Sequence, residues 1–141
     1  MDYHFKNFVF EGGGVKGIAY LGALDVLEQR GILQNIERIG GTSAGAINAV
    51  LLGLNYSTNE VRDIIWSLNF NNFMDNSWGI LKDMKRLKDQ FGWYKGDYFR
   101  NWIAQLIKAK TGNSESTFAD IEALKVKKNF RSMYFMGTNL S

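Results

Sequence analysis

The chain has 141 residues, a length typical of one domain, since domains commonly span about 100–200 residues. With 45% hydrophobic and 22% charged residues, the composition predicts neither a disordered nor a membrane-spanning chain. The sequence contains no cysteine and one histidine, His4, which excludes a disulfide scaffold, a thiolate metal site, a cysteine nucleophile and a two-histidine zinc site. A net charge of +3 suits weak attraction to an anionic membrane or to nucleic acid, but an ordinary solvated surface explains it better.

The compartment is predicted from what the sequence lacks. No cationic segment followed by an apolar run occurs at the N-terminus, so no secretory signal is predicted. The longest apolar stretch, from Ala44 to Leu54, is too short to span a bilayer. The lack of cysteine agrees with a reducing compartment. We therefore expect a cytoplasmic protein or one at the periphery of a membrane.

The first half of the chain alternates between predicted strands and helices. The apolar run 8–10 predicts a buried strand, and residues 18–29, apolar on nearly every side, predict a buried helix that Gly31 ends. A second strand over 36–39 is followed by a second buried helix over 44–54. This order predicts a right-handed βαβ unit with parallel strands.

The second half continues with amphipathic helices and one further strand. Ser57 to Glu60 has the Ser-x-x-Glu form of a capping box and precedes an amphipathic helix. Asp97 is the predicted N-cap of the next helix, residues 108–116 form a polar linker, and residues 130–136 form a third strand. The predicted apolar face of the helix after Asp97 consists of Phe99, Trp102, Ile103, Leu106 and Ile107, and another helix is predicted to start at Thr117–Asp120.

A glycine-rich turn, Glu11–Gly17, lies between the first strand and the first helix. Its backbone amides can point at one spot near a helix N-terminus, which is a site suited to an anion. Gly12, Gly14 and Gly17 also fit the dinucleotide-binding fingerprint, which expects an acidic residue at the end of the second strand. Glu37 lies at the start or middle of that strand instead. The pattern of a Walker A loop is excluded, because Lys16 precedes Gly17 and no Ser or Thr follows.

A second turn, Gly41–Gly45, has the form Gly-x-Ser-x-Gly and stands directly between a strand and a helix. This is the context that a nucleophile elbow requires. Small residues on both sides of Ser43 let the strand and the helix cross closely, and the helix N-terminus favours developing negative charge. With the glycine-rich turn one βαβ unit upstream, the sequence predicts that Ser43 is a nucleophile.

Together these residues resemble a known family, the patatin-like phospholipases. The resemblance rests on Phe10–Gly17 and Gly41–Gly45, and continues more weakly in Gly92–Asp97, Thr117–Ile121 and Tyr134–Ser141. It implies a three-layer α/β/α fold with a mainly parallel sheet, present here in part. Residues 1–141 would be the N-terminal part of one such domain, with an aromatic and basic insertion over about 66–96.

The resemblance implies a serine lipid acyl hydrolase of the phospholipase A or esterase type. Ser43 would attack an ester carbonyl, and the amides of Gly13 and Gly14 would hold the oxyanion, with support from Lys16. The remaining motif positions are Gly12, Gly17, Gly41, Ala44 and Gly45. The substrate would be a phospholipid or another lipid ester at a membrane surface. No cofactor, metal or nucleic acid is expected.

The family uses a Ser–Asp dyad without histidine, with the aspartate in an Asp-Gly motif. None of the eight aspartates of this chain is followed by glycine. Asp97 and Asp120 are better explained as helix caps than as the base. We therefore expect the dyad aspartate to be missing and the chain alone to be inactive. The chain would be either a fragment of a longer protein, which we favour, or a truncated relative.

Ten aromatic residues and a basic cluster lie between Trp66 and Trp102. In a lipase they would suit a lid or acyl-chain groove, whereas a secondary core is the simpler explanation for Phe99 and Trp102. For Trp78, Phe91 and Trp93 both explanations stay open, and base stacking ranks below them. Two alternatives to the hydrolase remain: a dinucleotide-binding module, and a non-catalytic domain that binds a membrane or a partner.

Overall fold

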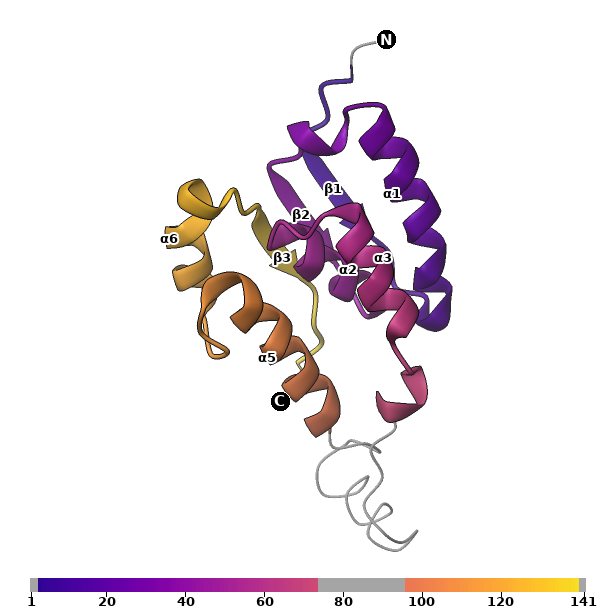
Figure 1. The fold of residues 1–141 in the computed structure, drawn as a ribbon, viewed down its shortest axis with the longest axis vertical. Coiled ribbons are helices and arrows are strands. Elements are labelled where there is room, and N and C mark those ends of the chain that lie inside the picture. Colours follow the sequence, from indigo (N-terminus) through magenta and orange to yellow (C-terminus); the bar gives the residue numbers. More distant parts are fainter. Residues whose placement is uncertain (1–2, 74–95, 140–141) are drawn as a thin grey trace, which may run out of the picture. The chain divides into compact units, whose positions relative to one another are not determined.

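The computed structural model describes residues 3–73 and 96–139 (Figure 1). The chain forms two compact units, one comprising 1–67 and 116–141 and the other comprising 68–115. The expectations for Trp78, Phe91 and Trp93, and for the basic cluster among them, lie outside the described residues.

The first unit is built on a three-stranded parallel sheet in the order β1-β2-β3. The strands are β1 (Asn7–Phe10), β2 (Arg38–Gly41) and β3 (Ser132–Phe135), and Phe10 pairs with Gly41, which pairs with Phe135. The predicted parallel arrangement is confirmed. The second strand starts later than predicted, because a 3₁₀ turn over Leu33–Asn35 precedes it, and it runs through both glycines that follow Ile39.

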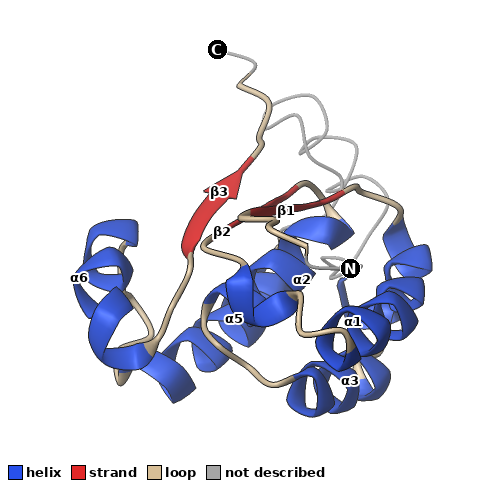
Figure 2. Cartoon of the chain, turned by 90° about the horizontal axis from the view of Figure 1, so that it is seen from above, coloured by secondary structure: helices blue, strands red, loops and turns tan. Residues whose placement is uncertain are grey.

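Helix α2 (Ala44–Gly53) packs against the sheet and is buried along most of its length. Its buried side chains include Ile47, Ala49, Leu51 and Leu52, so the prediction of a buried helix is confirmed here. Helix α3 (Thr58–Ser67) lies on the same side of the sheet, as does α1 (Tyr20–Gln29) (Figure 2). The opposite face of the sheet carries Val9 and Tyr134, which are 74% and 58% exposed.

The prediction of a buried helix over 18–29 is wrong in two respects. Residues Gly14–Ala19 form a 3₁₀ helix, and α1 begins only at Tyr20. Only Leu21 and Leu24 of α1 are buried, since the helix packs one side against α3 and the neighbouring turns. Its other sides face solvent. Gly31, with φ of +66°, ends the segment as predicted.

The predicted capping box at Ser57–Glu60 is present, and the helix start predicted at Thr117–Asp120 also has this form. The Ser57 amide donates to the Glu60 carboxylate at 2.7 Å, and the Glu60 amide donates to the Ser57 hydroxyl at 3.2 Å. Helix α6 (Phe118–Lys128) begins with the reciprocal pair of Thr117 and Asp120. Each box satisfies two amides that the first helical turn leaves without a partner.

The second unit contains a 3₁₀ turn (Phe70–Phe73) and helix α5 (Asp97–Thr111). The N-cap of α5 is Gly96, with φ of +78°, so the prediction that Asp97 caps this helix is wrong. Asp97 instead adds negative charge to the first turn, where the helix dipole favours it. The helix also continues into the predicted polar linker, up to Thr111.

Three aromatic side chains of α5 gather around the ring of Phe73. Phe73 contacts Tyr98, Phe99 and Trp102 with ring centroids 5.5–5.7 Å apart. Phe99 is nonetheless 39% exposed, and no side chain of α5 is fully buried. The expected secondary core is therefore a cluster of partly exposed rings within the described residues.

Candidate active site

Ser43 occupies a sharp turn between β2 and α2. Its φ and ψ are 51° and −129°, a left-handed backbone conformation that residues other than glycine rarely adopt. The residue is exposed and precedes the first residue of α2, Ala44, so that it stands at the N-terminus of a helix. A strained turn of this kind presents a serine hydroxyl at the carboxyl edge of a parallel sheet.

The two glycines that flank Ser43 let the strand and the helix cross closely. A Cβ atom built on Gly41 would lie 2.4 Å from the Gly45 carbonyl oxygen. A Cβ atom on Gly45 would lie 2.5 Å from the Glu11 oxygen and 2.6 Å from the Phe10 oxygen. Contacts this short with backbone atoms leave no room for a methyl group at either position, which explains why the turn carries glycine there.

The glycine-rich turn after β1 lies against the serine turn. A Cβ atom on Gly12 would approach the Ser43 Cβ to 2.9 Å, and one on Gly17 would lie 3.3 Å from the Ala44 Cβ. Gly17 is buried, whereas Gly13, Gly14 and Lys16 are exposed. The fold thus brings together the two turns that the sequence singles out.

The glycine-rich turn offers unused hydrogen-bond donors beside Ser43. Within residues 3–73 and 96–139, the amides of Gly12, Gly13 and Gly14 donate to no protein acceptor. The Gly13 carbonyl accepts from the Lys16 amide at 3.1 Å, which closes the turn, and Gly14 has φ of +56°. Exposed amides next to a helix N-terminus are suited to a developing negative charge.

Sequence reasoning missed Tyr20, which contacts the glycine-rich turn from the start of α1. Its hydroxyl donates to the Glu11 carbonyl at 2.9 Å, and its ring packs edge-on against Phe10 with centroids 5.0 Å apart. An aromatic residue at the start of a helix resembles any core residue in the sequence. The only available signal was its position directly after the turn.

The described part of the chain contains four aspartates. Asp25 is paired with Arg62, Asp120 belongs to the cap of α6, and Asp63 is exposed on α3. Asp97 belongs to the second unit. Among the described residues, none of these carboxylates has a hydrogen bond to Ser43.

The structure also bears on the dinucleotide-binding alternative. That fingerprint places an acidic residue at the carboxyl end of the second strand. Here Glu37 precedes β2, at the opposite end, and forms an ion pair with Lys6 at 2.8 Å. The bound Lys6 ammonium holds the pKa of Glu37 below its ordinary value. The carboxyl end of β2 leads instead into Thr42 and Ser43.

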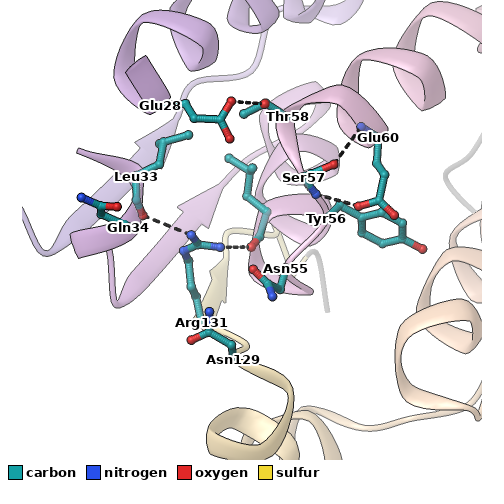
Figure 3. Close-up of a pocket in the computed structure, with 11 residues that line it drawn as sticks. Glu28, Leu33, Gln34, Asn55, Tyr56, Ser57, Thr58, Glu60, Asn129 and Arg131 are labelled. Carbon is teal, nitrogen blue, oxygen red and sulfur yellow. Dashed lines mark hydrogen bonds between the residues drawn. The ribbon is translucent and has the colours of Figure 1, made fainter. Parts of the chain in front are cut away.

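A polar cavity of about 380 Å³ is lined by residues that include Glu28, Thr58 and Arg131, and Ser43 is not among its lining residues (Figure 3). The Arg131 guanidinium donates from its three nitrogens to the carbonyls of Ile36, Leu52 and Leu33 at 2.6–3.1 Å, and burial lowers its pKa. Glu28 accepts from the Thr58 hydroxyl nearby. Arg131 thus links the segment before β3 to α2 and to the segment before β2, and Glu28 links α1 to α3.

The described residues hold no group of three or more His, Cys, Asp or Glu side chains arranged to bind a metal ion. Nor does any helix found there have the length and apolar character needed to cross a bilayer.

The parallel sheet, with the serine turn and the glycine-rich turn at its carboxyl edge, defines an α/β protein. Residues 8–139 match the family described as patatin-like phospholipase. The chain therefore belongs to the patatin-like phospholipase family.

Curated relatives of this chain are longer proteins. It is 40% identical over 107 residues to the uncharacterized protein YqhO of Bacillus subtilis (strain 168), covering 72% of this chain and 36% of YqhO. It is 31% identical over 122 residues to the uncharacterized protein R571 of Acanthamoeba polyphaga mimivirus, covering 86% of this chain and 40% of R571. The chain thus spans about two fifths of the length of these relatives.

Solved structures share the fold at low sequence identity. Full-length ExoU from the type III secretion system of Pseudomonas aeruginosa, solved in complex with SpcU, matches with a TM-score of 0.63 and 22% identity. The match covers 97% of this chain and 33% of ExoU. VipD from Legionella pneumophila matches with a TM-score of 0.51 and 24% identity, over 88% of this chain and 27% of VipD. The expected patatin-like α/β fold is confirmed.

Proposed function

We propose that this protein is a lipid acyl hydrolase in which Ser43 is the nucleophile. The observation that carries the proposal is the strained, exposed turn at Ser43, with unused amides of the glycine-rich turn beside it. Membership of the patatin-like phospholipase family supports a lipase-type activity. The proposed substrate is a phospholipid or another lipid carboxylic ester at a membrane surface.

The proposed reaction has two acyl-transfer steps. The Ser43 oxygen attacks the ester carbonyl carbon and passes its proton to a base, which yields a tetrahedral oxyanion. Collapse of this intermediate forms an acyl-enzyme, and the base returns the proton to the departing alcohol. Water then attacks the acyl-enzyme in the same way and releases the fatty acid. Each step needs donors that hold the oxyanion.

The amides of Gly13 and Gly14 are the proposed oxyanion donors. Both residues are exposed. They follow Gly12, the residue of the same turn that closely approaches Ser43. Losing one such donor typically costs about 3–4 kcal/mol of transition-state stabilisation. Lys16, also exposed on this turn, would add positive charge near the oxyanion.

The proposed base is an aspartate that is not among the eight of this chain. None of the four described aspartates has a hydrogen bond to Ser43. His4 is also excluded as a partner, because it precedes β1 whereas Ser43 follows the opposite end of the parallel strand β2. A strand of four residues separates these edges by about 13 Å. We therefore propose that residues 1–141 alone do not turn over substrate.

The test is fatty-acid release from phosphatidylcholine vesicles by the complete gene product. We expect release by the wild type and none above background by Ser43→Ala. The variant keeps the Cβ atom, so loss of activity would trace to the hydroxyl. Equal release by both proteins, or none by the wild type, would contradict the proposal. An inert wild type that still sediments with the vesicles would favour the non-catalytic membrane-binding alternative.

A further inference from the structure

We propose that Tyr20 is a positioning residue that fixes the glycine-rich turn beside Ser43 through its hydroxyl group. The inference rests on the proposed hydrolase function and adds a residue to its machinery. The proposed role involves no contact between Tyr20 and the reacting atoms. Tyr20 acts through the peptide between Glu11 and Gly12, the first peptide of the turn.

The carbonyl of Glu11 is held from two sides. The Tyr20 hydroxyl donates to it at 2.9 Å. On the other side the same oxygen lies against the first turn of α2, where a Cβ atom on Gly45 would meet it at 2.5 Å. The packing against Gly45 limits how far the oxygen can move, and the hydroxyl supplies its hydrogen bond.

This contact controls where the next amide points. No peptide bond in the described chain is cis, so the Gly12 N–H lies on the opposite side of its peptide from the Glu11 oxygen. A carbonyl fixed toward Tyr20 therefore fixes the Gly12 amide away from it. The turn then continues directly into Gly13 and Gly14, whose amides are the proposed oxyanion donors.

The preceding carbonyl shows that the end of β1 is anchored to the serine turn itself. The Phe10 oxygen accepts from the Thr42 amide at 3.3 Å, next to Ser43. The hydroxyl of Tyr20 thus secures the first carbonyl beyond this backbone contact. Its ring is independently anchored, because it packs edge-on against Phe10, which is 1% exposed.

The hydroxyl can be separated from the ring by substitution. Tyr20→Phe keeps the ring packing against Phe10 and removes only the donor to Glu11. A residue with a purely structural role would lower the thermal stability and leave the rate of the folded enzyme unchanged. A positioning residue lowers kcat, because small displacements of oxyanion donors cost large factors in rate.

The test compares wild type, Tyr20→Phe and Tyr134→Phe as complete gene products. Tyr134 is the matched control, since it is exposed on the open face of the sheet. Hydrolysis of a short-chain p-nitrophenyl ester gives kcat and KM, and a thermal melt gives Tm. We expect Tyr20→Phe to lower kcat about 10–100-fold with KM within twofold and Tm within a few degrees. Tyr134→Phe should stay within twofold of wild type in both constants.

Three results would overturn the proposal. Unchanged kcat in a folded Tyr20→Phe, beside an active wild type, would refute the role of Tyr20 alone. A large fall in Tm with unchanged kcat per folded molecule would make the role structural. An inert wild type would refute the proposed hydrolase function, and the inference with it.

Discussion

Gly12 and Ser43 come from different turns, yet a single methyl group on Gly12 would lie 2.9 Å from the Ser43 Cβ atom. Real Cβ contacts are not this short, so the glycine-rich turn can only sit here because residue 12 has no side chain. This closeness joins the predicted oxyanion donors to the predicted nucleophile.

Substitution of Gly12 should separate the two turns. Gly12→Ala would push the glycine-rich turn away from Ser43, because the opposing Cβ belongs to a residue fixed in a strained turn. Complete loss of one oxyanion donor typically lowers kcat by about 10²–10³-fold. Because Gly12→Ala would displace the donors without removing them, we expect kcat for ester hydrolysis to fall at least about tenfold. Steady-state kinetics of the complete gene product measures this. Wild-type kcat in the variant would show that the contact is not needed.

The backbone of Ser43 should carry measurable strain. Ser43→Gly and Ser43→Ala both remove the hydroxyl, but only glycine relaxes at φ of 51°. Such strain costs about 1–3 kcal/mol, and the greater freedom of glycine in the unfolded chain offsets about 0.5–1 kcal/mol of the gain. We expect Ser43→Gly to exceed Ser43→Ala by about 1 kcal/mol in free energy of unfolding, measured in urea. A more stable Ser43→Ala would contradict the observed conformation.

Two helical glycines should respond to alanine in opposite directions. Gly22 in α1 has no atom within 4 Å of a Cβ position, so Gly22→Ala should stabilise by about 0.5–1 kcal/mol. Gly45→Ala would instead force α2 away from the Glu11 and Phe10 carbonyls and destabilise by about 1–3 kcal/mol. Thermal or urea unfolding of both variants gives the comparison. Stabilisation by both would show that β1 and α2 do not cross closely.

The cap of α6 predicts a dependence of stability on pH. The Thr117 amide and hydroxyl donate to the Asp120 carboxylate at 2.8 and 2.7 Å, and these bonds lower the pKa of Asp120 from its ordinary 3.8. A lowered native pKa gives stability that is present above about pH 4 and is lost as pH falls through the native value. Asp120→Ala should therefore be less stable than wild type at pH 7, by a margin that shrinks below pH 3. A margin independent of pH would show that the carboxylate charge contributes nothing to the cap.

The alternation of strands and helices could be predicted from the sequence because it depends on local patterns. Apolar runs marked β1 and α2, and Ser57 and Thr117 marked the starts of α3 and α6. The two turns could be predicted to meet because parallel strands bring their carboxyl ends to one edge of a sheet. Each of these inferences used only residues that are close in the chain.

Features that depend on long-range packing or on backbone angles could not be predicted from the sequence. Helix α1 carries Leu21, Leu24, Val26 and Leu27, but it lies at the flank of the unit and buries only Leu21 and Leu24. The hydrogen bond from Tyr20 to Glu11 depends on how α1 folds back along β1, which no local pattern specifies. The N-cap of α5 is Gly96 and not Asp97, because the chain enters this helix with a left-handed backbone angle.

The central claim is that Ser43 is an activated nucleophile, and covalent labelling tests it most directly. A fluorophosphonate probe is added to the complete gene product, and the modified peptide is identified by mass spectrometry. We predict that phosphorus becomes bonded to the Ser43 oxygen as fluoride leaves, and that labelling is lost in Ser43→Ala. Modification of another residue, or labelling that persists in Ser43→Ala, would contradict the claim.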